Sequence, residues 1–227
     1  MKSGGFGRRV DRVIRDIFDQ IAPGWYGFRH WTIFRSELEA LAHRWQKGSL
    51  LNIGSAHGPD FLPFSQNFTL CGVDFSSQML SFARQYACKF KLTLNLFLAD
   101  AVYLPFADRV FDWVISVATY HHIRGDSERQ AALSELRRVL KPGGEAFITV
   151  WNRWQPGFWF GAKEIAVPWR TKNKILERYY YLFSYPELES LVTGAGFILL
   201  KSFPESSYRF PFKIFSRNIC LLVKKAD

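Results

Sequence analysis

Hydrophobic positions along the chain recur with two different periods, and segments of the two kinds alternate. Short apolar runs bounded by turn-forming residues predict seven strands, at residues 49–53, 70–73, 92–98, 110–117, 146–150, 197–203 and 218–224. Apolar side chains at helical spacing predict helices at residues 8–20, 33–45, 77–86, 126–140 and 185–194. Strands that alternate with helices are joined by crossovers, so the pattern predicts an α/β fold with a mainly parallel sheet and helices on both faces.

Breaks in this pattern divide the chain, which we expect to form a single domain over residues 1–227. Pro23 and Gly24 are predicted to end the first helix and to be followed by an aromatic loop at 25–31. The run Lys141-Pro142-Gly143-Gly144 is predicted to be a turn before the fifth strand. We expect an N-terminal helical cap at 1–47, a core at 48–150, an aromatic and basic insertion at 151–183, and a C-terminal helix and strand pair at 184–227.

Composition narrows the class of protein. Of the 227 residues, 48% are hydrophobic and 17% aromatic, which excludes a disordered or fibrous chain and supplies a large core. A run of 18 apolar residues and a secretory signal are both missing from the sequence, so we expect no membrane association. The three cysteines are widely spaced among apolar neighbours, which favours buried thiols in a reducing, cytoplasmic compartment over disulfides or a metal site.

The net charge of +10 is unevenly distributed. Residues 48–150 sum to zero, whereas residues 1–47 carry +4 and residues 151–227 carry +6. A basic surface binds polyanions because each neutralised phosphate releases counterions. The alternative is a solvated basic surface that only keeps the protein soluble.

A turn with glycines indicates a nucleoside site. Residues 52–58 follow the first strand of the core, and Asp74 ends the next strand, twenty residues after Gly54. In doubly wound folds such a turn approaches the ligand closely and the acid accepts both ribose hydroxyls. Asp100 and Ala101, after the third strand, are placed to reach an adenine edge. An ordinary tight loop is the alternative for the turn alone. The candidate cofactor-binding residues are Gly54, Ser55, Gly58, Asp74, Phe75, Asp100, Ala101 and Ser116.

Together with residues 72–80, 111–116 and 140–144, this order resembles the class I S-adenosylmethionine-dependent methyltransferases over about residues 45–150. The resemblance implies S-adenosylmethionine as cofactor. It also implies a doubly wound, seven-stranded, mainly parallel, Rossmann-like sheet with an antiparallel last strand. Two positions depart from the family pattern: Asn52 stands where the turn usually begins with an acid, and Ala56 replaces a central glycine. Alanine does not adopt a positive φ cheaply.

Further segments resemble one subfamily, the tRNA wobble-uridine carboxymethyl methyltransferases. This resemblance implies methylation of the carboxylate of 5-carboxymethyluridine, tRNA as a partner, and a small zinc-binding activator subunit. The segments that carry it are 18–23, Arg29, Trp31, 115–122, 129–133, 178–183, 187–189 and 195–197.

The chemistry that this resemblance implies needs alignment rather than a strong base. A carboxylate with a pKa near 4 is already ionised at pH 7, so positioning in a dry pocket is enough. Arg29 is a candidate catalytic residue that holds the substrate carboxylate or a phosphate, and the alternative is an ion pair with Asp19. His122, the second catalytic candidate, has a backbone hydrogen bond as its alternative role. Tyr26 and Trp151 are candidates to stack on the substrate base, with core packing as the alternative.

Three hypotheses therefore stand side by side. The first is a tRNA-modifying methyltransferase, favoured by the basic flanks. The second is a methyltransferase of the same fold that acts on a small molecule such as a quinone, a lipid or another metabolite. The third is an inactive scaffold that keeps the fold, which Asn52 and Ala56 motivate.

Overall fold

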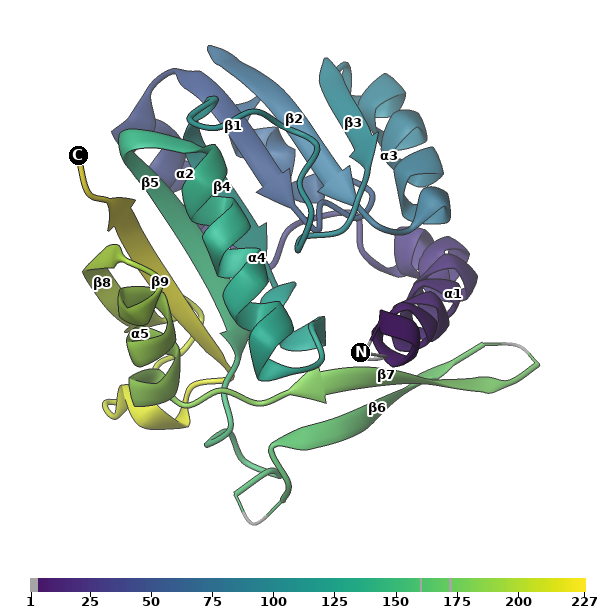
Figure 1. The fold of residues 1–227 in the computed structure, drawn as a ribbon. Helices are drawn as coiled ribbons and strands as arrows, with labels where there is room; N and C mark the ends of the chain where they lie inside the picture. Colours follow the sequence, from purple (N-terminus) through teal and green to yellow (C-terminus); the bar gives the residue numbers. More distant parts are fainter. Residues whose placement is uncertain (1–3, 160, 172) are drawn as a thin grey trace.

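The computed structural model describes residues 4–159, 161–171 and 173–227, with side chains from Arg12 onward. Seven strands form one sheet in the order β3-β2-β1-β4-β5-β9-β8 (Figure 1). Only β9 runs antiparallel to its neighbours in that sheet, so the predicted mainly parallel sheet with an antiparallel last strand is confirmed. The strands are β1 (Gly48–Ile53), β2 (Phe68–Asp74), β3 (Leu94–Leu98), β4 (Phe111–Val117), β5 (Leu140–Trp151), β8 (Phe197–Pro204) and β9 (Asn218–Lys225).

Helices cover both faces of this sheet, as doubly wound folds require. On one face, α4 and α5 bury side chains such as Leu136 and Leu188 against β1, β4, β5 and β9. On the other face, α2 and η1 bury Trp45 and Phe61 against the alternate residues of the same strands. The helical segments are α1 (Gly4–Phe28), α2 (Arg35–Trp45), η1 (Pro59–Phe64), α3 (Ser77–Phe90), η2 (Tyr120–His122), α4 (Asp126–Val139), α5 (Tyr185–Gly194) and η3 (Lys213–Phe215).

The first helix does not end at Pro23, so the predicted break was wrong. α1 continues through the proline to Phe28. Proline removes one backbone hydrogen bond and crowds the preceding turn, but contacts beyond it hold the last turns in place. The Tyr26 ring stacks on Phe82 of α3 at 4.8 Å, and Trp25 packs against Trp169 at 5.4 Å between ring centroids. Tertiary packing therefore overrides the local helix-breaking tendency.

Residues 151–183 contain a β-hairpin that the sequence pattern did not reveal. β6 (Glu164–Arg170) pairs with β7 (Ile175–Tyr181) antiparallel, as a separate two-stranded sheet. Figure 1 shows the hairpin next to α1, beyond the arrowheads of the parallel strands. In β6 the less exposed residues Ile165, Val167 and Trp169 alternate with exposed ones, but Ala166 and Pro168 between them are not polar, which weakens the two-residue period in the sequence.

The turn predicted at Lys141–Gly144 is instead part of a strand. β5 begins at Leu140 and runs through these residues to Trp151. The pairing with β4 shifts register there, because Phe111 pairs with Leu140 whereas Trp113 pairs with Glu145. The extra residues are accommodated as an irregularity in the ladder, which short-range turn propensity cannot distinguish from a loop.

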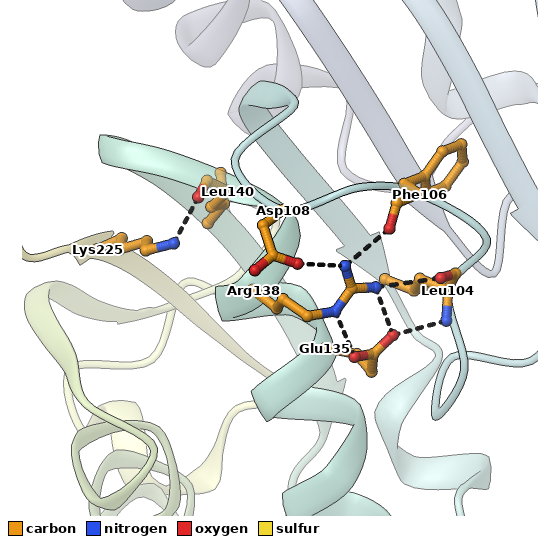
Figure 2. Close-up of polar contacts among 7 residues, drawn as sticks. All are labelled: Leu104, Phe106, Asp108, Glu135, Arg138, Leu140 and Lys225. Carbon is orange, nitrogen blue, oxygen red and sulfur yellow. Dashed lines mark hydrogen bonds and ion pairs between the residues drawn. The ribbon is translucent and has the colours of Figure 1, made fainter.

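Arg138 of α4 forms hydrogen bonds and ion pairs with the long connection between β3 and β4 and holds it against α4 (Figure 2). Its guanidinium binds the carboxylates of Glu135 and Asp108 at 2.6 Å and 2.8 Å. It also donates to the carbonyl oxygens of Phe106 at 2.7 Å and Leu104 at 3.1 Å. In the same view Lys225 of β9 donates to the Leu140 carbonyl at 2.6 Å. The connection that Arg138 holds begins with Ala99 and Asp100.

Arg138→Met is expected to lower the free energy of unfolding by about 1–2 kcal/mol, since a partly exposed cation loses several charge-assisted hydrogen bonds. Arg137→Met is the matched control, because Arg137 makes a single bond of 3.3 Å to the Gly196 carbonyl. Its effect should stay within about 0.5 kcal/mol. Urea unfolding curves of both variants test this, and equal losses would contradict the role given to Arg138.

Candidate cofactor and substrate site

A cavity of about 320 Å³ lies at the carboxyl ends of the parallel strands. Its wall includes Gly54 after β1, Asp74 at the end of β2, Asp100 after β3 and Val117 at the end of β4. β1 lies between β2 and β4, so the order in which successive strands are added to the sheet reverses at this point. Such a switch point is where doubly wound folds bind ligands. α1 and the β6–β7 hairpin supply the opposite wall, through residues such as Phe18 and Trp169.

The glycine turn adopts the left-handed backbone that its composition requires. Gly54 has φ of 73° and Gly58 has φ of 92°. A Cβ atom on Gly54 would lie 2.2 Å from the Thr119 hydroxyl oxygen, so only glycine fits there. The amides of Gly54 and Ser55 both donate to the Val73 carbonyl, at 2.8 Å and 2.9 Å, which fixes the turn over the end of β2.

Asp74 joins the glycine turn to the helix that follows β2. One carboxylate oxygen accepts the Ala56 amide at 2.9 Å, and the other accepts the Ser76 amide at 2.9 Å. Burial raises the pKa of Asp74 to about 6, against the lowering effect of these bonds. The group is therefore mostly ionised at pH 7. Its remaining lone pairs can accept two ribose hydroxyls, because the side chain lines the cavity.

Asn52 lies beneath the turn rather than in the described cavity wall. The side chain is fully buried, and its amide oxygen and nitrogen both lack a hydrogen-bond partner among the described residues. The missing family acid at this position therefore removes no direct contact with the cavity. The site residues fit a nucleoside cofactor, since the turn and the carboxylate of Asp74 are in place.

The other cofactor candidates divide into two groups. Phe75, Asp100 and Ala101 line the cavity together with Gly54 and Asp74. The second group, Ser55, Gly58 and Ser116, lies outside the described wall of the cavity, in or beside the glycine turn. In that group the Ser116 hydroxyl donates to the Ile53 carbonyl at 3.2 Å, and the Ser55 hydroxyl is buried without a partner among the described residues.

The substrate candidates also differ in whether they line the cavity. Arg29, His122 and Trp151 line the cavity. Tyr26 does not belong to the described wall: its ring stacks on Phe82 and meets His57 edge-on at 5.4 Å. In this structure the half-buried Tyr26 ring packs on other rings, and its stacking on a substrate base stays a prediction.

Arg29 is not paired with Asp19. The Asp19 carboxylate instead accepts the Ser76 hydroxyl at 2.6 Å and the Gln78 amide at 3.1 Å, at the start of α3. The Arg29 guanidinium carbon lies 4.9 Å from the centre of the Trp25 ring. Burial lowers the pKa of Arg29, and the nearby negative charge of Asp60 counters that effect. The guanidinium remains a cation at physiological pH.

Two adjacent histidines on η2 are neutral, His121 buried and His122 half-buried in the cavity wall. Nδ1 of His122 bonds to the Tyr179 carbonyl at 2.9 Å. A carbonyl can only accept, so Nδ1 carries the proton and Nε2 is left as an acceptor. Burial lowers the pKa of His122 to about 4. Nδ1 of His121 accepts the Trp151 amide at 3.2 Å, and burial holds its pKa well below the usual range. Neither imidazole is an effective proton acceptor near pH 7.

Sequence reasoning missed four charged residues in the cavity wall, Asp60, Arg124, Glu128 and Arg178, of which Asp60 and Arg178 are buried. Asp60 lies on η1, and burial raises the pKa of its carboxyl group. Arg178 lies on β7, and its Nη1 donates to the Tyr180 hydroxyl at 2.9 Å. The sequence signal was the segment 178–183, which carried a resemblance but no local pattern for a site. Only the position of the hairpin beside α1 brings Arg178 to the cavity.

The described part of the chain holds no group of three or more His, Cys, Asp or Glu side chains arranged to bind a metal ion. None of the helices described is both long enough and apolar enough to cross a membrane.

Cofactor affinity should decrease on acidification through Asp74. Protonation turns an acceptor into a donor, so below pH 6 the ribose hydroxyls lose a partner. We expect the dissociation constant of S-adenosylhomocysteine to rise by about tenfold between pH 7.5 and pH 5, because the ionised fraction falls with the pKa of about 6. Calorimetric titration across this range measures it. Asp74→Asn is the control and should bind more weakly at every pH, with no such dependence. If the dissociation constant changes with pH as strongly in Asp74→Asn as in the wild type, then Asp74 is not the group that causes the change.

Ala56 has φ of 46°, a left-handed backbone that costs a residue with a Cβ atom about 1–2 kcal/mol. Ala56→Gly removes this strain at some cost in chain entropy, so we expect the free energy of unfolding to rise by about 0.5–1 kcal/mol. Ala131→Gly, at an exposed position inside α4, is the control and should lower it by about 1 kcal/mol. Urea unfolding of both variants decides the sign, and a decrease for Ala56→Gly would show that the turn is not strained there.

Comparison with known proteins places this site in a family. A family model described as a methyltransferase domain matches residues 51–148. A protein of Encephalitozoon cuniculi, whose name describes it as a methyltransferase, is 30% identical over 76% of this chain and 80% of its own length. The tRNA (carboxymethyluridine(34)-5-O)-methyltransferase of Schizosaccharomyces pombe is 26% identical over 84% of this chain and 91% of its own. A cattle relative named as a tRNA methyltransferase is 31% identical over 72% of this chain, which spans only 34% of that protein.

Solved structures share the fold at lower identity. The 1,6-didemethyltoxoflavin-N1-methyltransferase of Burkholderia thailandensis, solved with S-adenosylhomocysteine, has a TM-score of 0.71 at 19% identity and covers 97% of this chain and 90% of its own. A complex of the Haloferax volcanii Trm112 methyltransferase activator with a methyltransferase gives a TM-score of 0.62 at 18% identity, over 92% and 98% of the two chains. Because a relative is matched at 30% identity over most of both chains, and the sheet and its switch-point cavity agree, this chain belongs to the class I S-adenosylmethionine-dependent methyltransferases.

Proposed function

We propose that this enzyme methylates the carboxylate of 5-carboxymethyluridine at the wobble position of tRNA. The observation that carries the proposal is the charge of the cavity wall. The wall holds three arginines, and two of them, Arg29 and Arg178, lie close enough to the neutral histidines His121 and His122 for their charge to lower the pKa of His121. Such a wall orients an anion and does not remove a proton. The name of the fission yeast relative, which describes this reaction, supports the assignment.

Each part of the cavity then has a role in the proposal. Bound S-adenosylmethionine supplies a methyl group on a positively charged sulfur. Asp74 binds the ribose of the cofactor, and Asp100 with Ala101 contacts its base. Arg29 orients the substrate carboxylate, which is ionised at pH 7 and attacks without a general base. The Nε2 atom of His122 is left as a hydrogen-bond acceptor, since its Nδ1–H bonds to Tyr179.

A basic and aromatic loop at residues 205–217 supports tRNA as the substrate. The loop precedes β9, whose first residue pairs with Trp151 at the end of β5, so it lies at the same sheet edge as the cavity. Phe210 and Phe212 are each 62% exposed, and Arg209, Lys213 and Arg217 add positive charge. Exposed rings stack on unpaired bases and cations bind phosphates, which suits a single-stranded anticodon loop.

A small activator protein is part of the proposal. The Haloferax volcanii neighbour was solved in complex with such an activator. In this chain β3 is an edge strand of the sheet, and it exposes Phe97 and Leu98, with Tyr103 nearby at 80% exposure. An apolar edge strand left open to solvent is a site for strand pairing with another chain.

The test is transfer of a labelled methyl group from S-adenosylmethionine to bulk tRNA of the source organism. Clarified lysate supplies any activator, and a lysate-only reaction gives the background. We expect the label to enter tRNA and to be released as methanol by mild alkali, as a carboxylate ester requires.

Alkali-stable label would move the reaction to another atom of the RNA. Absence of label above the background would favour a small-molecule substrate. Asp74→Asn, added to the same lysate, should lower incorporation and thereby show that the label is transferred by this protein.

A further inference from the structure

Arg178 is a buried cation without a matching anion. Its side chain lies on β7 and the residue is 7% exposed. One donor bonds to the Tyr180 hydroxyl at 2.9 Å, and Nε is buried without a partner among the described residues. The ion pairs found in the described residues do not include Arg178. A buried guanidinium is costly unless a ligand or a carboxylate compensates its charge.

Aromatic rings surround this guanidinium on several sides. Its central carbon lies 5.2 Å from the Tyr180 ring centre, 5.3 Å from that of Trp169 and 5.7 Å from that of Trp25. These rings stabilise a cation through their electron-rich faces and exclude water. The central guanidinium carbon of Arg29 lies 4.9 Å from the centre of the same Trp25 ring, so both cations contact one ring of the cavity wall.

Asp60 offsets the charge of Arg29 only in part. Its carboxyl group makes no ion pair within 4 Å to either arginine in the described structure, although its negative charge counters the effect of burial on the pKa of Arg29. The other acids of the wall, Asp74, Asp100 and Glu128, come from β2, the β3–β4 connection and α4. Arg124, the third arginine of the wall, is exposed, so the buried Arg178 with Arg29 is the part of the cavity suited to holding an anion away from water.

We propose that Arg178 is a specificity-determining residue that binds the carboxylate of the substrate and selects it over neutral uridine derivatives. The inference rests on the proposed function. A guanidinium presents a planar fork of donors that matches a carboxylate, and the Nε–H of Arg178 is a buried donor without a partner among the described residues. Arg29, the first residue after α1, completes the anion site.

The reaction itself removes the charge that Arg178 binds. A carboxylate oxygen forms a bond to the methyl carbon, the bond from that carbon to sulfur breaks, and its electron pair stays on sulfur. The carboxylate loses its negative charge, the sulfonium loses its positive charge, and no proton moves. The neutral ester no longer matches the arginine pair, so the same contact that selects the substrate favours release of the product.

The test compares two anticodon stem-loop RNAs that differ only at C5 of the wobble uridine. One bears a carboxymethyl group and the other the neutral carbamoylmethyl group of nearly the same shape. Their dissociation constants are measured by fluorescence anisotropy with S-adenosylhomocysteine present and with the activator, if the activity assay requires it. For the wild type we expect the acid to bind about tenfold more tightly than the amide, as loss of a charged hydrogen-bond pair predicts.

Arg178→Met should reduce this preference to less than about twofold while leaving affinity for S-adenosylhomocysteine unchanged. Arg178→Lys keeps the charge without the planar fork and should give an intermediate preference for the acid. This variant provides the test if Arg178→Met does not fold. Arg170→Met is the matched control, since Arg170 is an exposed arginine on the same hairpin. It should weaken both RNAs alike and leave the preference intact.

Several outcomes would overturn the inference. A wild-type preference that persists in Arg178→Met would exclude Arg178 as the selecting residue and leave the proposed function standing. An equal loss of affinity for both RNAs would show that Arg178 binds a backbone phosphate. If the wild type itself does not distinguish acid from amide, the carboxylate substrate is wrong, and the proposed function fails together with this inference.

Discussion

The buried carboxylate of Asp74 joins the parts of the molecule on which the cofactor site depends. It accepts the Ala56 amide of the glycine turn and the Ser76 amide at the start of α3. Ser76 in turn caps α3 through the Met79 amide and donates its hydroxyl to Asp19 of α1. The turn, α3 and α1 are thus positioned by one connected set of hydrogen bonds. Burying that carboxylate is costly, and its pKa of about 6 reflects the cost.

The wall of the cavity opposite the cofactor residues is formed by a different contact, the packing of α1 against the β6–β7 hairpin. Trp25 and Trp169 meet there, and each also contacts the Arg178 guanidinium. The close approach of the two segments is helped by Gly24, where a Cβ atom would lie 3.3 Å from the Trp169 ring. Aromatic packing therefore closes the cavity and holds a cation in it at the same time.

The two sides differ in how they treat charge. On the cofactor side an acid remains mostly ionised because backbone amides offset part of its burial. On the substrate side the histidines are neutral because burial and the nearby arginines both disfavour a further positive charge. This division suits a reaction that joins an anion to a methyl group without moving a proton. A histidine with a pKa near 7 would have suggested proton abstraction instead.

The sequence by itself determined the seven strands of the main sheet and the order of the helices between them, the glycine turn and the acid at the end of β2. Each of these is a local pattern, because strand period, turn chemistry and the Ser76 cap depend on residues close together in the chain. Tertiary structure decided the continuation of α1 through Pro23, the packing of Tyr26, the hairpin and the entry of Arg178 into the cavity. All four depend on contacts between segments far apart in the sequence. In the N-terminal cap the apolar period predicted a helix but not its continuation past Pro23, and the insertion at 151–183 showed no clear period, so the end of α1 and the hairpin are fixed only where the two segments meet.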